Sequence, residues 1–429
     1  MAKTKKGKLT LEDVLVPVEE QPYEIPEKWC WVKLEAIVSV VTGKKDANYG
    51  SEDGEYTFFT CAGEPIRCDG FSFEGESLLL PGNGANVGQV FYYNGKFEAY
   101  QRTYVLQAIV DNINLKYLYY QMLFAWNDAN KDKQFGSATN YIKMGNFTSY
   151  DVPLPPLAEQ KRIVEQIEKL FTKLDTAREK ALTVVESFEL SKKAIYKKAF
   201  EGSLTNSWRA ENGINILHWE KIPFEKLGNL ERGRSKHRPR NDERLFGGEY
   251  PFIQTGDVTG AGMYVTSHKQ TLSEFGFEQS RMFPKGTLCI TIAANIGDAA
   301  ILSYDCCFPD SVVGFTPGEK CFNKYMYFYL QEIKAELEYI APATAQKNLN
   351  LKLLGEVEIK VPSLKEQEKI VEILEKQINY QESIVEKAEN VIETIDMMKK
   401  SILAKAFRGE LGTNVESEES AIELLKSIL

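Results

Sequence analysis

The sequence predicts an α+β protein: two globular α+β domains separated by two long antiparallel coiled-coil helices, with pseudo-two-fold symmetry. The first observation is a repeat, because residues 154–204 and 361–411 align without a gap at an offset of 207 (361 − 154), and 22 of the 51 paired residues are identical. The second is the apolar spacing within each copy, which is typical of a coiled coil. The third is the segment before each copy, which is rich in aromatic and β-branched residues and in glycine turns. A gapless repeat of this length is a structural unit used twice.

Each repeat is expected to form one long helix, called an arm. The first arm follows a proline-bearing strand exit at Val152–Pro156, and the second follows Val361-Pro362; the arms end at Gly202 and Gly409. Proline suits the first turn of a helix, and glycine suits the left-handed residue that ends one. From Pro156 to Phe200 the first arm would be about 67 Å long at 1.5 Å per residue.

Apolar residues recur in each arm at alternating steps of four and three, which places them on one face of the helix. We expect the two arms to pair with each other through these faces; the alternative is that each arm pairs with another subunit. Gln377 and Gln381 interrupt the second face, where polar residues lower stability but can fix the register. The residues expected to pair the arms are Ile163, Ile167, Leu170, Leu174, Phe188 and Ile195 in the first, and Ile370, Leu374, Ile384, Val391, Ile395 and Ile402 in the second.

The segments before the arms, Trp29–Val152 and Trp219–Lys360, are named the first and second head. Short strands are expected near residues 55–60, 88–93 and 287–292, and one helix in each head, around Leu115–Ala125 and Lys324–Glu338. The heads resemble each other only weakly, so similar arms would hold two different recognition surfaces. The predicted divisions are 1–152 for the first domain with an N-terminal extension at 1–26, 153–204 for the first arm, 205–360 for the second domain, 361–412 for the second arm, and 413–429 for a C-terminal tail.

Composition describes an ordinary globular protein of two to four domains: 429 residues, 43% hydrophobic and 26% charged. No apolar run is long enough to span a membrane, and the basic start lacks the apolar stretch of a secretory signal. The seven cysteines are scattered without a CxxC pair, which favours reduced thiols in a cytoplasmic protein over a metal site.

A catalytic constellation is not found in the sequence. None of the three histidines lies in an HExxH pattern, and no phosphate-binding GxxxxGK[ST] loop occurs. The glycines of Gly82–Gly88 have the wrong spacing for a dinucleotide loop, and Asn-Pro-Pro-aromatic tetrapeptides of an amino-methyltransferase are missing. Glu356–Lys360 fits an alternating strand better than a nuclease motif. We therefore expect no catalytic residues, no metal and no cofactor bound by this chain.

Local basic clusters favour nucleic-acid binding although the net charge is −9. In the second head, six basic residues crowd a stretch with Gly233 and Pro239, so it should be a loop, and arginines there can contact phosphates and guanine edges. A solvated charged surface is the alternative for these basic residues. The side-chain amides among the candidates named below could instead satisfy backbone groups. The stretch carries Arg232, Arg234, Lys236, Arg238, Arg240 and Arg244. The remaining DNA-binding candidates are Lys44, Lys45, Arg102, Lys131, Lys133, Asn140, Tyr141 and Lys143 in the first head, and Lys347 and Asn348 in the second.

The arrangement resembles the specificity subunit of type I restriction-modification enzymes. The resemblance covers nearly the whole chain and depends on two diverged heads, each followed by an arm that opens with Pro-x-Leu-x-Glu-Gln-x-x-Ile-Val. These openings lie at Pro155–Val164 and Pro362–Val371, and the similar closings at Lys198–Gly202 and Lys405–Gly409.

The resemblance implies that each head is a target recognition domain that reads one half of a bipartite double-stranded DNA target. The arms would lie antiparallel as a spacer, and residues 1–26 and 413–429 would pack near them to close a circular arrangement. It also implies two methyltransferase subunits that carry S-adenosylmethionine and a restriction subunit that uses ATP and Mg. These partners could supply positive charge around the DNA. The competing hypothesis is a non-catalytic coiled-coil adaptor whose heads bind proteins.

Overall fold

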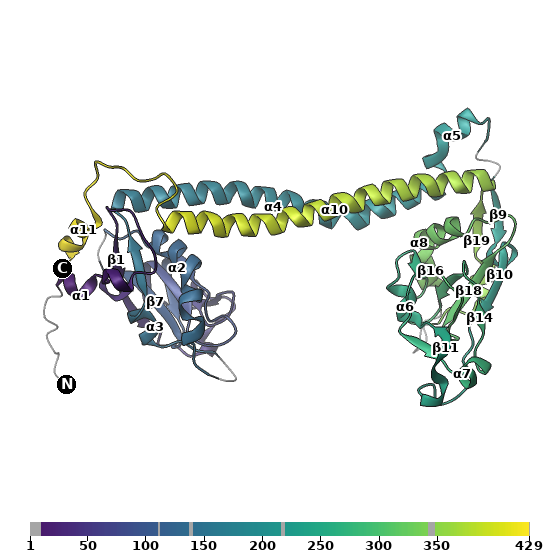
Figure 1. Cartoon of the computed structure of the whole chain (residues 1–429), viewed down its shortest axis with the longest axis horizontal. Coiled ribbons are helices and arrows are strands. Elements are labelled where there is room, and N and C mark those ends of the chain that lie inside the picture. The colour runs from purple at the N-terminus through teal and green to yellow at the C-terminus, as the bar shows by residue number, and fades with distance from the viewer. Residues whose placement is uncertain (1–9, 110–111, 137–139, 216–218, 342–347, 429) are drawn as a thin grey trace. The chain divides into compact units, whose positions relative to one another are not determined.

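The computed structural model describes residues 10–109, 112–136, 140–215, 219–341 and 348–428 (Figure 1). The chain divides into two compact units, residues 1–181 with 390–429 and residues 182–389. Each unit holds one head, the beginning of the arm that follows that head, and the end of the other arm. The division therefore falls within the arms and not at their ends.

The first head is built on a six-stranded sheet in the order β2-β7-β5-β6-β3-β4. In the central strand β5, Leu78 and Leu80 join the core on one face of the sheet, while Leu79 joins the core on the other, as the alternation of a strand requires. Helix α2 (Leu115–Asn130) covers the first face and begins at Asn114, whose side chain accepts the N–H of Tyr117 at 3.1 Å. The strands are β2 (Val38–Thr42), β3 (Tyr56–Phe59), β4 (Ile66–Cys68), β5 (Phe73–Pro81), β6 (Phe91–Ala99) and β7 (Thr103–Ala108).

The second head contains a five-stranded sheet, β10-β18-β15-β16-β12, and a four-stranded sheet, β13-β11-β17-β14. Helix α8 (Asn323–Ile340) contributes Tyr325, Met326 and Leu330 to the core on the five-stranded sheet. The strands are β10 (Gly228–Arg232), β11 (Phe246–Phe252), β12 (Tyr264–Val265), β13 (Gln270–Leu272), β14 (Met282–Phe283), β15 (Leu288–Thr291), β16 (Ala299–Leu302), β17 (Cys306–Cys307) and β18 (Val312–Pro317). Short helices α6 (Thr255–Thr259), α7 (Glu274–Glu278) and α9 (Leu351–Glu356) complete this head.

The two heads share one sheet topology, which their sequences barely reveal. The order β2-β7-β5-β6-β3 in the first head corresponds to β10-β18-β15-β16-β12 in the second. The last pair is parallel in both sheets, β3 with β6 and β12 with β16, and the other pairs are antiparallel. A two-stranded ribbon also precedes each arm: β1 (Cys30–Lys33) with β8 (Asp151–Leu154), and β9 (Glu220–Pro223) with β19 (Glu358–Val361).

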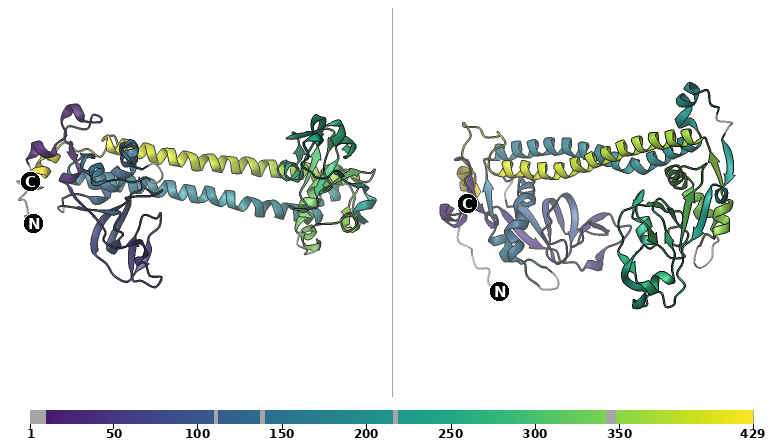
Figure 2. Two further views of the ribbon diagram at one scale, coloured as in Figure 1. Left: turned by 90° about the horizontal axis from the view of Figure 1, so that it is seen from below. Right: turned by 45° about the vertical axis from the view of Figure 1, so that its right-hand side comes forward.

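The arms are α4 (Leu157–Phe200) and α10 (Leu364–Phe407), each 44 residues long. In the first unit, Asp175 pairs with Lys399 and Arg178 with Asp396, so the two helices are antiparallel. In the second unit, Nε2 of Gln381 donates to Oγ of Ser191 at 2.7 Å, which links the two helices, while Oε1 of Gln381 is buried without a hydrogen-bond partner among the described residues. The helices lie side by side in each unit (Figures 1 and 2). The arms therefore pair within the chain, and Gly202 (φ 83°) and Gly409 (φ 73°) follow them in the left-handed conformation, as predicted.

The residues predicted to pair the arms divide into three groups. Ile163 and Ile167, near the start of α4, are fully buried in the core of the first head, which they share with Phe407 at the end of α10. Ile370 and Leu374 are buried in the same way with Phe200 and the second head. Along the paired helices Ile395 is buried, and the remaining members except Val391 are half-buried: Leu170, Leu174, Phe188, Ile195, Ile384 and Ile402.

Val391 corrects the predicted seam, because its side chain is 44% exposed. The half-buried neighbour Ile392 takes its place on the covered face. Ala388 and Ile395 lie seven residues apart (395 − 388) and are both buried, so the heptad itself holds here. Between them the covered face steps by four and then three residues, through Ile392, and not by three and then four, through Val391.

The C-terminal tail closes the first unit, as the resemblance implied. Arg162 of α4 donates to both carboxylate oxygens of Glu418, at 2.6 and 2.8 Å, and to the carbonyl of Thr413 at 3.0 Å. The N–H of Ala421, in α11 (Ala421–Ile428), donates to the carbonyl of Lys28 at 2.9 Å. Among the described residues, no helix has both the length and the apolar character needed to cross a membrane.

Candidate nucleic-acid interface

In the first head, four loops meet at one end of the six-stranded sheet. Directly after β2, the N–H of Gly43 donates to Thr103 at the start of β7, at 3.2 Å. A Cβ on Gly43 would lie 1.9 Å from the carbonyl oxygen of Ala99, so only glycine fits there. The loops after β5 and before α3 (Met144–Thr148) join this end through backbone hydrogen bonds from Gly82 to Arg102 (2.8 Å), from Ile142 to Gly82 (3.0 Å) and from Gly84 to Asn140 (2.9 Å).

The structure brings the first-head candidates together on these loops and on the adjoining turn. Nδ2 of Asn146 donates to the carbonyl of Lys133 at 3.2 Å, and the N–H of Lys143 donates to Oδ1 of Asn146 at 2.8 Å, which links the turn to the loops. Lys45 is half-buried, with Nζ 4.2 Å from the ring centroid of Tyr49. The exposed candidates are Lys44, Arg102, Lys131, Lys133, Asn140, Tyr141 and Lys143.

Tyr141 belongs to an exposed aromatic pair at this end of the sheet. Its ring stacks on Phe135 with centroids 5.5 Å apart, and the two side chains are 36% and 41% exposed. Nζ of Lys143 lies 4.2 Å from the Phe135 centroid, so a cation sits over the stack. This surface offers apolar and positively charged groups together, and its cations can contact phosphates.

The second head builds the corresponding end of its sheet from corresponding loops. The N–H of Gly233, directly after β10, donates to Val312 at the start of β18 at 2.8 Å. A Cβ on Gly233 would lie 2.3 Å from the carbonyl oxygen of Pro309, so this glycine repeats the role of Gly43. The N–H of Leu349 donates to Ile292 at 2.8 Å, as that of Ile142 does to Gly82 in the first head. Asn348 is exposed beside this contact, while Lys347 lies outside the described residues.

Residues 233–242 of the basic stretch form a loop, as predicted, whereas Arg232 is the last residue of β10 and Arg244 lies in a short 3-10 helix, Glu243–Leu245. The arginines of the stretch differ in what they contact. Nη1 of Arg238 donates to the carbonyls of Ser235 and His237, both at 2.8 Å. The Arg240 guanidinium instead pairs with the carboxylate of Asp310 at 2.8 Å. Arg232, Lys236, Arg238 and Arg240 are exposed, and Arg234 is half-buried.

Asp242 binds both Arg244 and His237 at the end of the basic stretch. Its carboxylate accepts hydrogen bonds from Arg244, the shortest at 2.7 Å, and lies 2.8 Å from Nε2 of His237. The hydrogen bonds from Arg244, followed by the contact with His237, hold the pKa of Asp242 well below its usual range. This carboxylate therefore stays ionised and neutralises part of the charge of the loop.

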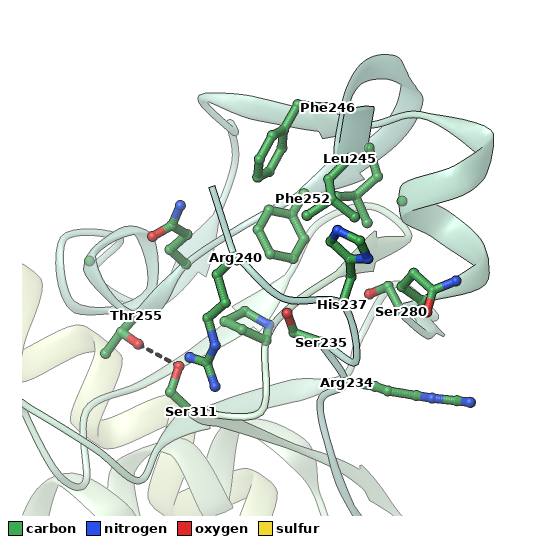
Figure 3. Close-up of a pocket in the computed structure, with 16 residues that line it drawn as sticks. Arg234, Ser235, His237, Arg240, Leu245, Phe246, Phe252, Thr255, Ser280 and Ser311 are labelled. Carbon is green, nitrogen blue, oxygen red and sulfur yellow. Dashed lines mark hydrogen bonds between the residues drawn. The ribbon is translucent and has the colours of Figure 1, made fainter. Parts of the chain in front are cut away.

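A pocket of about 190 Å³ lies under the arginine loop (Figure 3). Leu245, Phe246 and Phe252 form one side, and Arg240 lies toward Thr255 and Ser311, whose hydroxyl oxygens are 3.1 Å apart. At the rim, Nε2 of the exposed Gln254 donates to Oε1 of Gln270 at 2.6 Å. The pocket therefore has apolar residues on one side and polar side chains around them that can bind a ligand. Among the described residues, no group of three or more His, Cys, Asp or Glu is placed to hold a metal ion.

The family described as the type I restriction modification DNA specificity domain matches residues 26–186 and 217–394. The two matches include both heads and most of both arms. The chain belongs to this family. Because members of this family recognise DNA, the two loop-bearing sheet ends are the candidate DNA-binding surfaces, and the protein-binding adaptor is not favoured.

Individual relatives agree with this assignment. The chain is 27% identical over 446 residues to the specificity subunit of the Escherichia coli type I restriction enzyme EcoDI, covering 94% of this chain and 95% of that protein. It is 22% identical over 312 residues to the EcoKI specificity subunit of Escherichia coli K12, covering 68% and 66%. The crystal structure of the HsdS subunit from Thermoanaerobacter tengcongensis has a similar fold, with a TM-score of 0.61 at 18% identity, over 91% of this chain and all of that one.

Sequence reasoning missed several residues of these candidate surfaces. Gln101, Asp310, Gln254 and Gln270 contact one another or the basic loops, yet none lies in a basic cluster. Phe135 was missed because an aromatic residue in a loop carries no signal of exposure. The spacing of Gln101 and Asp310 before their strands could have indicated equivalent positions, but only once β7 and β18 had been matched.

Proposed function

We propose that each head reads one half of a bipartite double-stranded DNA target, as part of a type I restriction-modification complex. The observation that carries this proposal is the repeated sheet end. Corresponding loops gather basic and amide side chains in both heads, while the side chains themselves differ. Two heads that share a sheet topology but carry different loop side chains would recognise two different half-sites.

The paired arms would set the spacer between the half-sites and dock two methyltransferase subunits. Rigid paired helices hold their ends at a set distance and rotation, and DNA half-sites must present the correct groove at that spacing. In this assembly the chain itself is non-catalytic. S-adenosylmethionine would bind the methyltransferase partner, and ATP with Mg the restriction partner.

The acidic composition of this chain supports a DNA-binding surface that is shared with its partner subunits. A net charge of −9 opposes tight binding by this chain alone, because phosphate contacts dominate affinity for DNA. Positively charged partner surfaces would complete the channel, so the chain alone should bind DNA poorly.

Sequencing methylated adenines tests the proposal in cells that express the chain with its methyltransferase partner. The expected result is one bipartite motif with a spacer of fixed length. Replacing residues 29–152 with the corresponding head of a relative should then change one half-site and leave the other intact. A change in both halves, or a continuous motif, would refute independent heads.

A further inference from the structure

The same two loops are bridged by side chains in both heads, but by different chemistry. In the first head, Nε2 of Gln101 donates to Oδ1 of Asp46 at 3.1 Å. In the second head, Nη2 of Arg240 donates to Oδ1 and Oδ2 of Asp310 at 2.8 and 2.9 Å. In each head, the loop that precedes β7 or β18 is therefore tied to the loop that follows β2 or β10.

Gln101 and Asp310 occupy equivalent positions. Gln101 lies two residues before Thr103 (103 − 101), and Asp310 lies two residues before Val312 (312 − 310). The carbonyls of Thr103 and Val312 accept the N–H groups of the corresponding glycines that follow β2 and β10. One position of the shared frame therefore carries an amide in the first head and a carboxylate in the second.

Asp310 holds two arginines of the basic stretch at once. Its backbone carbonyl accepts from Nε of Arg232, while its carboxylate binds Arg240. Both contacts to Arg240 use Nη2, and the hydrogens on Nη1 and Nε make no hydrogen bond with the described residues. A guanidinium is planar and rigid, so fixing one nitrogen orients the whole donor group. The Arg240 side chain nevertheless remains 52% exposed and accessible to a ligand.

We propose that Arg240, oriented by Asp310, reads a guanine in the half-site recognised by the second head; this inference rests on the proposed function. Arginine most often recognises guanine in the major groove through the O6 and N7 acceptors. Because Asp310 holds Nη2 of Arg240, Nη1 is the terminal nitrogen left to donate to them. The adjacent carboxylate decides between a base and a phosphate, because it repels a phosphate but not the neutral acceptors of a base edge. Orienting the guanidinium beforehand also lowers the entropy lost on binding.

Arg238 provides the contrast within the same loop. Its guanidinium contacts two backbone carbonyls and no carboxylate among the described residues, so its charge remains available for a phosphate. In the first head the position of Asp310 holds Gln101, which cannot orient an arginine through an ion pair. An arginine held by a carboxylate at this position therefore occurs in the second head and not in the first.

The test maps methylated adenines in cells that express the full-length chain with its methyltransferase partner. Arg240→Ala should make one G·C position of one half-site degenerate, with discrimination at that position falling about 10- to 100-fold. Asp310→Asn should loosen the same position less. The double variant should match Arg240→Ala, because Asp310 is a positioning residue that acts through Arg240. Arg240→Lys keeps the charge but loses the planar donor group, so it should relax the same position. If the Arg240→Ala protein does not accumulate, the result for Arg240→Lys tests the guanine contact in its place.

Arg281→Ala is the matched control. Arg281 pairs with Glu231 at 2.6 Å in the same head, and the Glu231 side chain points to the opposite face of β10 from that of Arg232. This control should keep every position of the motif. If Arg240→Ala and Arg240→Lys retain the full motif and lower methylation evenly at all sites, Arg240 contacts a phosphate and the inference is overturned. If the unaltered complex shows no bipartite motif, the proposed function fails instead.

Discussion

The indole Nε1 of Trp29 donates a 2.9 Å hydrogen bond to the carboxylate of Glu159, across 130 residues of sequence. The second half of the chain repeats this contact between Trp219 and Glu366 at 3.0 Å. Each carboxylate also accepts from a threonine, Thr413 at 3.1 Å in the first unit and Thr205 at 2.8 Å in the second. The Glu of the arm opening therefore ties two segments to the start of each arm: the head and the chain that follows the other arm.

The environment of Glu366 predicts a large loss of stability when it is truncated. Its carboxylate pairs with Arg209 at 2.7 Å, and the two side chains are 1% and 5% exposed. Glu366→Ala would leave the guanidinium buried without its partner, which costs about 3–5 kcal/mol of the free energy of unfolding. Glu358→Ala, which removes the exposed pair with Lys221, should cost at most about 1 kcal/mol. Urea unfolding measures both variants, and equal losses would contradict the prediction.

The docking of the C-terminal tail should depend on pH through Glu418. Hydrogen bonds from Arg162 lower the pKa of Glu418 below its usual 4.5. The stabilisation is therefore fully present above about pH 4.5 and is lost as the pH falls through the lowered folded value. Hydrogen exchange of backbone amides in residues 413–426 should be faster in Glu418→Gln than in the unaltered chain at pH 7. The difference should disappear at sufficiently acidic pH. The exposed neighbour Glu419 supplies the control Glu419→Gln, and a difference that persists in acid would exclude this mechanism.

Deleting four residues from one arm should change the permitted spacer of the DNA target while leaving the bases of each half-site unchanged. Four residues shorten a helix by about 6 Å and rotate the next segment of the chain by about 40°. Methylation mapping of the variant with its methyltransferase partner measures the spacer directly. An unchanged spacer would show that the arms do not set it.

Neutralising the basic loop should weaken DNA binding and reduce its salt dependence. Replacing Arg232, Arg234 and Arg238 together with alanine should lower the slope of log K against log salt by about 0.9 for each phosphate that the loop no longer neutralises. Binding of the assembled methyltransferase complex to a duplex over a range of salt concentrations gives the slope. Arg281→Ala should leave it unchanged. Identical slopes for the triple variant and the unaltered complex would remove the loop from the interface.

The repeat predicted the arms accurately because coiled-coil spacing is local and is written directly in the sequence. Helices α4 and α10 end at Phe200 and Phe407, two residues before the expected glycines Gly202 and Gly409. The face of α10 was wrong by one residue at Val391, because the steps of three and four between the buried Ala388 and Ile395 can be taken in either order, and only the packing decides whether residue 391 or 392 is covered.

The heads combine features that the sequence predicted with features that it did not. Helix α2 begins at Leu115, as expected, since its apolar spacing and Asn114 cap are local. The common sheet topology of the heads, in contrast, arises from strand pairing over long separations and leaves almost no sequence identity. The basic loop was found from charge alone, whereas Asp310 was not, because its partner Arg240 lies 70 residues away.

The sequence by itself therefore determined the two arms and the duplicated plan of the protein, since both follow from local periodicity and repetition, whereas the contacts between the helices decided that they pair within one chain. Only the tertiary structure decided which loops meet at each sheet end and which arginine is held by a carboxylate. Such contacts join residues that are distant in sequence, and their geometry exists only after the strands have paired.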